Sequence, residues 1–207
     1  MSDLIKRVIS SIILLPLVFY FIFKGSFYLI FLIVICFSIA SYEWHKMVKL
    51  KLYRILGYIF LIISFYSFYE LSIEKFIIIP LCICISTDIG GYIFGKIFKG
   101  PKLTKISPNK TYAGAIGGYF LSLISLTIIT SYMNYPFLTV QFFIIFILIS
   151  TVSQIGDIII SYFKRKSKIK NTGKIIPGHG GLIDRIDGMI FAFPIYYLID
   201  LTGYLNI

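Results

Sequence analysis

Seven apolar runs, separated by short polar or glycine-containing segments, dominate the pattern of this chain. They cover residues 8–23, 27–42, 55–69, 76–98, 112–132, 137–163 and 183–201. A helix needs about 20 predominantly apolar residues to cross the hydrocarbon core of a bilayer, and these runs approach or reach that length. The pattern therefore predicts an all-α, polytopic transmembrane helical bundle of about seven spans.

The start of the chain has some features of a signal peptide, because Lys6 and Arg7 precede an apolar stretch. No small-residue cleavage site follows, and the apolar character resumes directly after Lys24-Gly25-Ser26. The first two runs are therefore expected to form a tight helical hairpin.

The composition excludes an ordinary soluble protein. Of the 207 residues, 58% are hydrophobic and only 14% are charged, whereas soluble domains have about 25% charged residues. Disorder is excluded as well, because it requires low hydrophobicity. The odd number of cysteines offers no disulfide framework, and Cys36, Cys82 and Cys84 are interpreted as small apolar core residues.

The 20 basic residues are divided unevenly between the polar segments. If the spans alternate in direction, all of them except Lys24 and Lys75 lie on the same side of the membrane as the N-terminus. Loops that are rich in Lys and Arg stay in the cytoplasm. We therefore expect a cytoplasmic N-terminus, cytoplasmic loops at residues 96–110 and 164–187, and an external C-terminal end.

The chain shows no composition shift that would mark a separate soluble domain. It is predicted to form a single integral membrane domain over residues 1–207. Residues 1–75 are expected to supply the N-terminal spans, and residues 76–207 a core that carries the two basic loops.

Asp88 lies well inside the apolar run of residues 76–98. An ionisable group at such a depth costs about 2.5 to 3.5 kcal/mol on insertion scales and marks a functional position by default. A structural Asp, hydrogen-bonded to a Ser or Thr of a neighbouring helix, is the alternative. Five other acidic residues are explained by solvated or interfacial positions near span ends: Asp3, Glu43, Glu70, Glu74 and Asp200.

Three more carboxylates are expected near the cytoplasmic membrane surface. Asp157 comes shortly before the basic end of the sixth run, and Asp184 and Asp187 open the seventh at i, i+3, on one face of a helix. Carboxylates among so many bases serve as ion-pair partners or as oxygen ligands of Mg²⁺, which proteins hold with one or two carboxylates plus substrate phosphates.

The loop before Asp184 favours the second of these two interpretations. Pro177, Gly178, His179, Gly180 and Gly181 form a segment whose backbone N–H groups can approach a ligand closely. Such segments and helix N-termini bind phosphate, and His179 could donate to a phosphoryl oxygen or to a leaving pyrophosphate.

A second glycine-rich segment has a structural interpretation. Gly90, Gly95 and Lys96 match part of a phosphate-binding loop, but Ile97 replaces the required Ser or Thr and the segment lies inside an apolar helix. Gly91 and Gly95 are better explained as a close helix–helix contact. Three glycines of the next span fit the same interpretation: Gly114, Gly117 and Gly118.

With these residues placed, the chain resembles the phosphatidate cytidylyltransferase (CDP-diacylglycerol synthase) family. Its C-terminal signature is matched here by Ser161, Lys164, Arg165, Lys170, Asn171, Gly173, Pro177, His179, Gly180, Gly181, Asp184, Arg185 and Asp187. Residues 88–95, 105–111 and 156–157 also resemble family segments, so the resemblance covers residues 86–194.

The resemblance implies transfer of the cytidylyl group from CTP to phosphatidate, with release of pyrophosphate. It implies Mg²⁺ as cofactor, with a second cation left open, and it places the family's metal-binding carboxylates at Asp157 and Asp184. Residues 76–207 would then be the catalytic core. The implied partners are CTP, phosphatidate and membrane lipid, without nucleic acid, and a homodimer is left open.

Further roles follow from charge and position within the same hypothesis. Besides the two metal ligands, the catalytic residues are predicted to be Asp187, Lys164, Arg165, His179 and Arg185. Substrate binding is assigned to Asp88, Ser107, Lys110, Thr111, Ser161, Lys170, Gly180 and Gly181. The expected location is a bacterial inner membrane, with the active site facing the cytoplasm.

Three departures from the family pattern bear on activity. Asn171 replaces an Asp, while Ile160 and Ala113 stand where many members have Glu. A non-catalytic homologue is therefore one alternative. A CTP-dependent polyprenol or lipid kinase and an ion-coupled membrane transporter are two others; a transporter predicts carboxylates strung across the membrane rather than gathered at one face.

Overall fold

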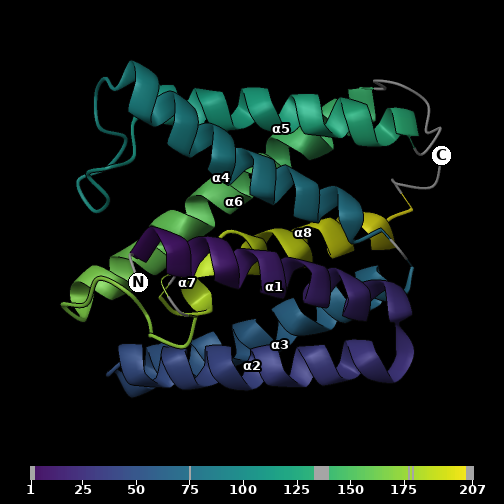
Figure 1. The fold of residues 1–207 in the computed structure, drawn as a ribbon, viewed down its shortest axis with the longest axis horizontal. Coiled ribbons are helices and arrows are strands. Elements are labelled where there is room, and N and C mark those ends of the chain that lie inside the picture. Colours follow the sequence, from purple (N-terminus) through teal and green to yellow (C-terminus); the bar gives the residue numbers. More distant parts are fainter. Residues whose placement is uncertain (1–2, 75, 133–139, 177, 179, 204–207) are drawn as a thin grey trace. The chain divides into compact units, whose positions relative to one another are not determined.

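The computed structural model describes residues 3–74, 76–132, 140–176, 178 and 180–203. These residues form helices and loops, and within the described ranges there is no β-strand, only two isolated bridges. The helices are α1 (Asp3–Lys24), α2 (Ser26–Met47), α3 (Lys51–Ile73), α4 (Ile78–Phe98), α5 (Tyr112–Tyr132), α6 (Val140–Lys166), α7 (Ile183–Ile186) and α8 (Met189–Leu201) (Figure 1). The predicted all-α class is confirmed.

Five of these helices, α2 to α6, are long and apolar enough to cross a membrane. Many of their large apolar side chains are exposed, among them Phe31 on α2, Ile62 on α3 and Ile116 on α5, as expected for helices that face lipid. The sequence predicted about seven spans. α8 has only 13 residues, whereas α1 has 22, of which Ile12–Lys24 is the apolar part described. The number of spans stays a prediction.

The last apolar run is not one helix, which corrects the sequence-based prediction for residues 183–201. The chain leaves the helical conformation after Ile186 and resumes it at Met189. At the break, the Asp187 carboxylate accepts the N–H of the next residue, Gly188, at 3.0 Å. An Asp that bonds to its neighbouring backbone competes with helix formation.

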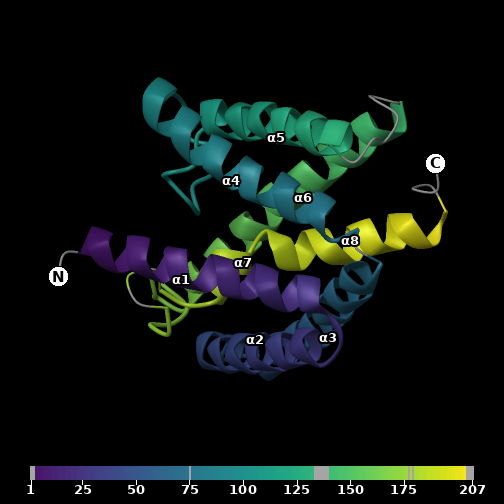
Figure 2. The same ribbon diagram turned by 45° about the vertical axis from the view of Figure 1, so that its right-hand side comes forward.

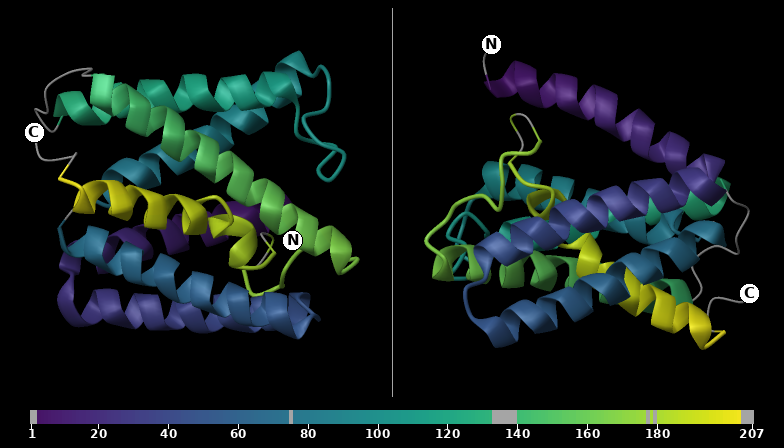
Figure 3. Two further views of the ribbon diagram at one scale, coloured as in Figure 1. Left: turned by 180° about the vertical axis from the view of Figure 1, so that it is seen from behind. Right: turned by 90° about the horizontal axis from the view of Figure 1, so that it is seen from below.

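The described chain divides into two compact units. Unit 1 consists of Met1–Glu74 and Phe163–Ile186, and unit 2 of Lys75–Tyr162 and Asp187–Ile207. α6 is one continuous helix whose last turn belongs to unit 1 (Figure 3). The segment 163–186, which includes most of the second basic loop, thus groups with the N-terminal helices.

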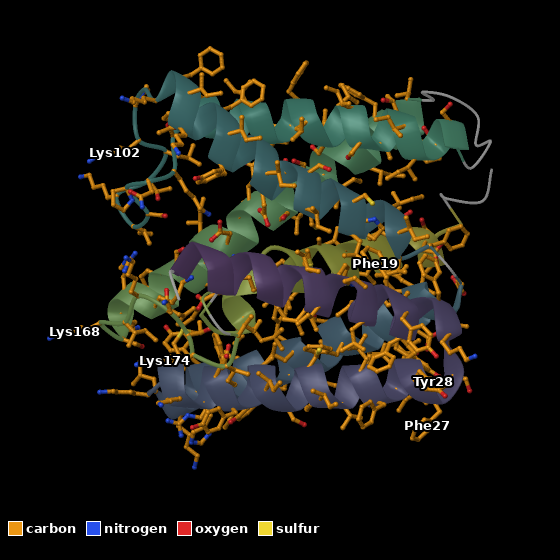
Figure 4. The ribbon with its side chains drawn as sticks, in the orientation of Figure 1. Phe19, Phe27, Tyr28, Lys102, Lys168 and Lys174 are labelled. Atoms are coloured by element: carbon orange, nitrogen blue, oxygen red, sulfur yellow. The ribbon has the colours of Figure 1, made fainter. Side chains whose placement is uncertain are left out.

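In unit 1, α1 and α2 form the predicted hairpin. The turn at Gly25 and Ser26 has positive φ angles of 64° and 46°, and Figure 4 shows Phe27 and Tyr28 just beyond it. α2 and α3 then run side by side (Figure 2). The indole of Trp44 packs where Gly57 has no side chain, and its Nε1 donates to the carbonyl of Arg54 at 3.2 Å.

In unit 2, α4 and α5 pack closely through glycines, as predicted. Gly91 and Gly95 of α4 lie against Gly114 of α5, and Gly90 lies against the backbone of Gly117. Thr87 on α4 also hydrogen-bonds to Ser150 on α6, with 2.9 Å between the two hydroxyl oxygens. Small residues let the helix backbones approach, and buried hydroxyl pairs add hydrogen bonds between helices.

We expect Gly90→Ala to destabilise unit 2 by about 1 to 3 kcal/mol, the usual cost of overpacking. The added Cβ would overlap the carbonyl oxygen of Gly117, which is backbone and cannot rotate away. Gly91→Ala is the matched control, because its Cβ meets only the Gly114 carbonyl oxygen, at 3.7 Å. Thermal unfolding in detergent measures the stability of both variants. Equal stability of the two would contradict this account of the packing.

Candidate active site

The carboxylate of Asp184 is held in one orientation by three donors within unit 1. Its Oδ1 accepts from Lys164 Nζ at 2.9 Å, and its Oδ2 accepts the N–H groups of Thr172 at 2.8 Å and Gly181 at 3.0 Å. The Asp184 side chain is only 6% exposed. The side chain of this predicted metal ligand is therefore oriented by contacts within unit 1.

Lys164 lies on α6, and the other two donors belong to the loop between α6 and α7, which begins at Ser167 (Figure 3). Figure 4 shows two of its basic residues, Lys168 and Lys174. Ile169 N donates to the carbonyl of Lys164 at 3.0 Å, where α6 ends. Further along, Ile176 and Gly180 exchange two backbone hydrogen bonds, at 3.0 and 3.2 Å. Backbone hydrogen bonds within the loop therefore help to fix its conformation.

A second carboxylate, that of Glu43 on α2, holds the same loop. Its Oε1 accepts the N–H of Leu182 at 2.9 Å, and its Oε2 accepts the N–H of Ile183 at 2.9 Å and the hydroxyl of Thr172 at 2.8 Å. We call this arrangement the Glu43 clamp. Glu43 is 1% exposed, so the sequence-based interpretation of Glu43 as a solvated residue is wrong.

The physical reason is that α2 continues past the apolar run that ended at residue 42. Its last turn, up to Met47, is covered by the loop instead of by water. A signal was present in the sequence, because Ala40, Glu43, Trp44 and Met47 have helical i, i+3, i+4, i+7 spacing and are all buried. A carboxylate within such a stripe has to be hydrogen-bonded from elsewhere in the chain.

Two glycines provide the space for the Glu43 carboxylate. A Cβ at Gly181 would lie 2.5 Å from Glu43 Oε2, and a Cβ at Gly173 would overlap Oε1. Both glycines belong to the signature found in the sequence. The structure thus gives Gly173 and Gly181 a steric role, which for Gly181 stands beside its predicted role in substrate binding.

In unit 2, Asp157 on α6 forms an ion pair with Lys110. Asp157 Oδ1 also accepts from the hydroxyl of Ser161, one turn further along the helix, at 3.4 Å. The side chains of Asp157 and Lys110 are 29% and 23% exposed. Three residues that the sequence assigned to metal and substrate binding are thus brought together.

Lys110 is positioned by the loop between α4 and α5. Leu103 N donates to the carbonyl of Lys110 at 2.7 Å, and Lys110 N donates to the carbonyl of Ser107 at 3.0 Å. Thr111 acts as the N-cap of α5, because its Oγ1 accepts the N–H of Gly114 at 3.1 Å. Figure 4 shows Lys102 on the same loop.

Asp187 lies differently from the prediction, and the role of Asp88 stays a prediction. Asp187 is buried in the turn before α8 rather than on a helix with Asp184, so the expected i, i+3 pair on one helix face is wrong. Asp88 is an exposed residue of α4.

The other predicted residues of unit 1 are placed as follows. Arg165, Lys170 and Arg185 are exposed, and His179 and Pro177 lie outside the described residues. Gly180 donates its N–H to Ile176 and Gly181 donates its N–H to Asp184. The two amides that were predicted to contact phosphate are therefore used within the loop.

The carboxylates of the two centres fit the requirements of Mg²⁺ better than those of a metal held by protein alone. Among the described residues, no three His, Cys, Asp or Glu side chains gather around a common metal position, so a metal held wholly by protein ligands, such as structural zinc, does not fit. A carboxylate offers about four lone-pair positions, and Asp184 uses three. One or two such carboxylates, completed by phosphate and water, suit Mg²⁺.

Fold and site together define a helical protein with membrane-spanning segments and two carboxylate–lysine centres beside glycine-containing loops. The chain belongs to the cytidylyltransferase family, which matches residues 5–77 and 74–202. It is 37% identical over 214 residues to a phosphatidate cytidylyltransferase of Rickettsia typhi, covering 97% of this chain and 93% of the relative.

Two further relatives bear the same name. A protein of Rickettsia felis is 36% identical over 215 residues, covering 97% of this chain and 93% of the relative. A protein of Staphylococcus aureus is 38% identical over 136 residues, which is 64% of this chain and 52% of that relative.

Proposed function

We propose that this chain transfers the cytidylyl group of CTP to phosphatidate and forms CDP-diacylglycerol and pyrophosphate. The similarity to relatives of that name carries the proposal, because it extends over nearly the whole chain. In the reaction, a phosphate oxygen of phosphatidate bonds to the α-phosphorus of CTP, and the bond from that phosphorus to the oxygen bridging to the β-phosphorus breaks. The attacking phosphate is already ionised, so it needs no strong general base.

Asp157 and Asp184 are proposed to hold Mg²⁺, which supplies charge neutralisation for the phosphates when it is bound. Two observations support this assignment. Both carboxylates keep lone pairs beyond their present hydrogen bonds, and each has a lysine beside it, Lys110 or Lys164. We propose that these ammonium groups contact phosphate oxygens of substrate.

The remaining assignments stay proposals. Arg165, His179, Arg185 and Asp187 would complete the catalytic set. Asp88, Ser107, Lys110, Thr111, Ser161, Lys170, Gly180 and Gly181 would contact substrate. The unequal distribution of basic residues supports a cytoplasmic N-terminus and cytoplasmic basic loops in a bacterial inner membrane of about seven spans.

The identity of the nucleotide product tests the proposal. Purified protein in mixed micelles is given phosphatidate, Mg²⁺ and CTP labelled at the α- or the γ-phosphorus. We expect the α-label to enter lipid and pyrophosphate to be released. Transfer of the γ-label to an added polyprenol, with release of CDP, would show a kinase instead. Solute flux in liposomes without CTP would show a transporter.

A further inference from the structure

The Glu43 clamp and the Asp184 contacts share one segment of chain. Thr172 donates its hydroxyl to Glu43 and its N–H to Asp184. Gly181, Leu182 and Ile183 follow one another, and their N–H groups go to Asp184, Glu43 and Glu43 in turn. Two acidic residues from different helices therefore fix the same two stretches of backbone.

Burying a carboxylate is unfavourable unless charged hydrogen bonds compensate for the lost water. Glu43 accepts three, and an ionised carboxylate is acceptor-only, so it matches donors alone. These three donors are two backbone amides and a hydroxyl, and none of them is basic. The negative charge is thus used to organise loop backbone rather than to balance a neighbouring lysine.

We infer that Glu43 is a positioning residue for the transfer reaction, an inference that rests on the proposed function. It holds Thr172 through the hydroxyl and binds the N–H groups of Leu182 and Ile183, the two residues that follow Gly181. It thereby fixes the chain at the two amides that orient Asp184. Glu43 acts through the loop and is not assigned any contact with substrate. Residues that orient metal ligands from outside typically change metal affinity or activity 10- to 100-fold when they are replaced.

Glu43→Gln is the first test, because the amide group keeps the size of the side chain and replaces one acceptor by a donor. Whichever way the amide turns, its NH₂ meets a backbone N–H, either that of Leu182 or that of Ile183. We expect kcat per folded molecule to fall about 10- to 100-fold and the Mg²⁺ concentration for half-maximal rate to rise. KM for phosphatidate should stay unchanged. Glu70→Gln, the same substitution on α3 of unit 1, is the control.

Thr172 gives a second and milder test. Thr172→Val keeps the shape of the side chain and removes only the hydroxyl that donates to Glu43, while the N–H to Asp184 remains. Thr172→Ser keeps the hydroxyl and should restore activity. Because both substitutions act on one hydrogen-bond network, the effects of Glu43→Gln and Thr172→Val on kcat should not be additive when the two are combined.

Hydrogen exchange of the amides at residues 172 and 181–183 supplies a readout that is independent of catalysis. Exchange should be slow in the wild type and faster in Glu43→Gln, at equal amounts of folded protein. Unchanged exchange, or wild-type kcat per folded molecule in both Glu43→Gln and Thr172→Val, would overturn the inference. An inactive wild type with protected amides would overturn the proposed function, and with it the positioning role, while the clamp itself would stand.

Discussion

Asp184→Asn is expected to lower kcat/KM for CTP-dependent conversion of phosphatidate by about 10²- to 10³-fold, as for loss of a preorganised electrostatic group. The asparagine oxygen can still accept the N–H groups of Thr172 and Gly181, so the loop keeps its conformation. The negative charge is lost, however, and the amide NH₂ then faces Lys164. The substitution thus separates the charge of Asp184 from its role in loop structure.

Two companion variants complete this test in membranes or in detergent. Asp184→Ala removes both the charge and the acceptor of three hydrogen bonds, so it should also lower the melting temperature. Glu70→Gln controls for removal of a charge in the same unit. Near-normal turnover of Asp184→Asn would rule out Asp184 as a metal ligand.

Asp157→Asn is expected to have a similarly large effect, about 10²-fold or more on kcat/KM. Its physical basis differs, because Asp157 is partly exposed and its ion pair with Lys110 contributes little to stability. We therefore expect loss of activity with little change in thermal unfolding. Asp200→Asn, on α8 of the same unit, is the matched control and should keep wild-type activity.

A double variant at Asp157 and Lys110 distinguishes metal binding by Asp157 from simple ion pairing. If Asp157 only neutralised Lys110 and Lys110 made no contact with substrate, then replacing both residues together, as Asp157→Asn with Lys110→Gln, would restore activity. If Asp157 holds Mg²⁺, the double variant stays inactive, and the single Asp157→Asn variant needs more Mg²⁺ for its residual rate. Restored turnover in the double variant would contradict the metal assignment.

Much of the helix pattern could be predicted from the sequence, because burial in lipid leaves a local signal. The run at residues 112–132 coincides with α5, and the glycines that bring α4 and α5 together were recognised by their spacing. The family signature also predicted which carboxylates bind metal and which lysines belong to the active site. It did not indicate the pairing, and the structure joins Lys110 to Asp157 and Lys164 to Asp184.

The break after Ile186 and the role of Glu43 were not predicted, for a common reason. Both depend on hydrogen bonds to backbone N–H groups, which every residue except proline carries and which leave no mark in the sequence. Apolar periodicity continues across Asp187 and Gly188, so it cannot reveal a local Asp-to-backbone bond. The donors to Glu43 lie up to 140 residues away along the chain, so the local apolar stripe around Glu43 could indicate its burial but not its partners.

That separation along the chain has a consequence for biosynthesis. At ribosomal rates of about 5 to 20 residues per second, Glu43 is made roughly 7 to 28 s before Ile183, which lies 140 residues later. During this interval α3 to α6 are synthesised, while the Glu43 carboxylate near the end of α2 still has to be hydrated. We therefore expect the loop to dock on α2 only late in assembly. In a nascent chain that ends before residue 172, the last turn of α2 should be exposed to water.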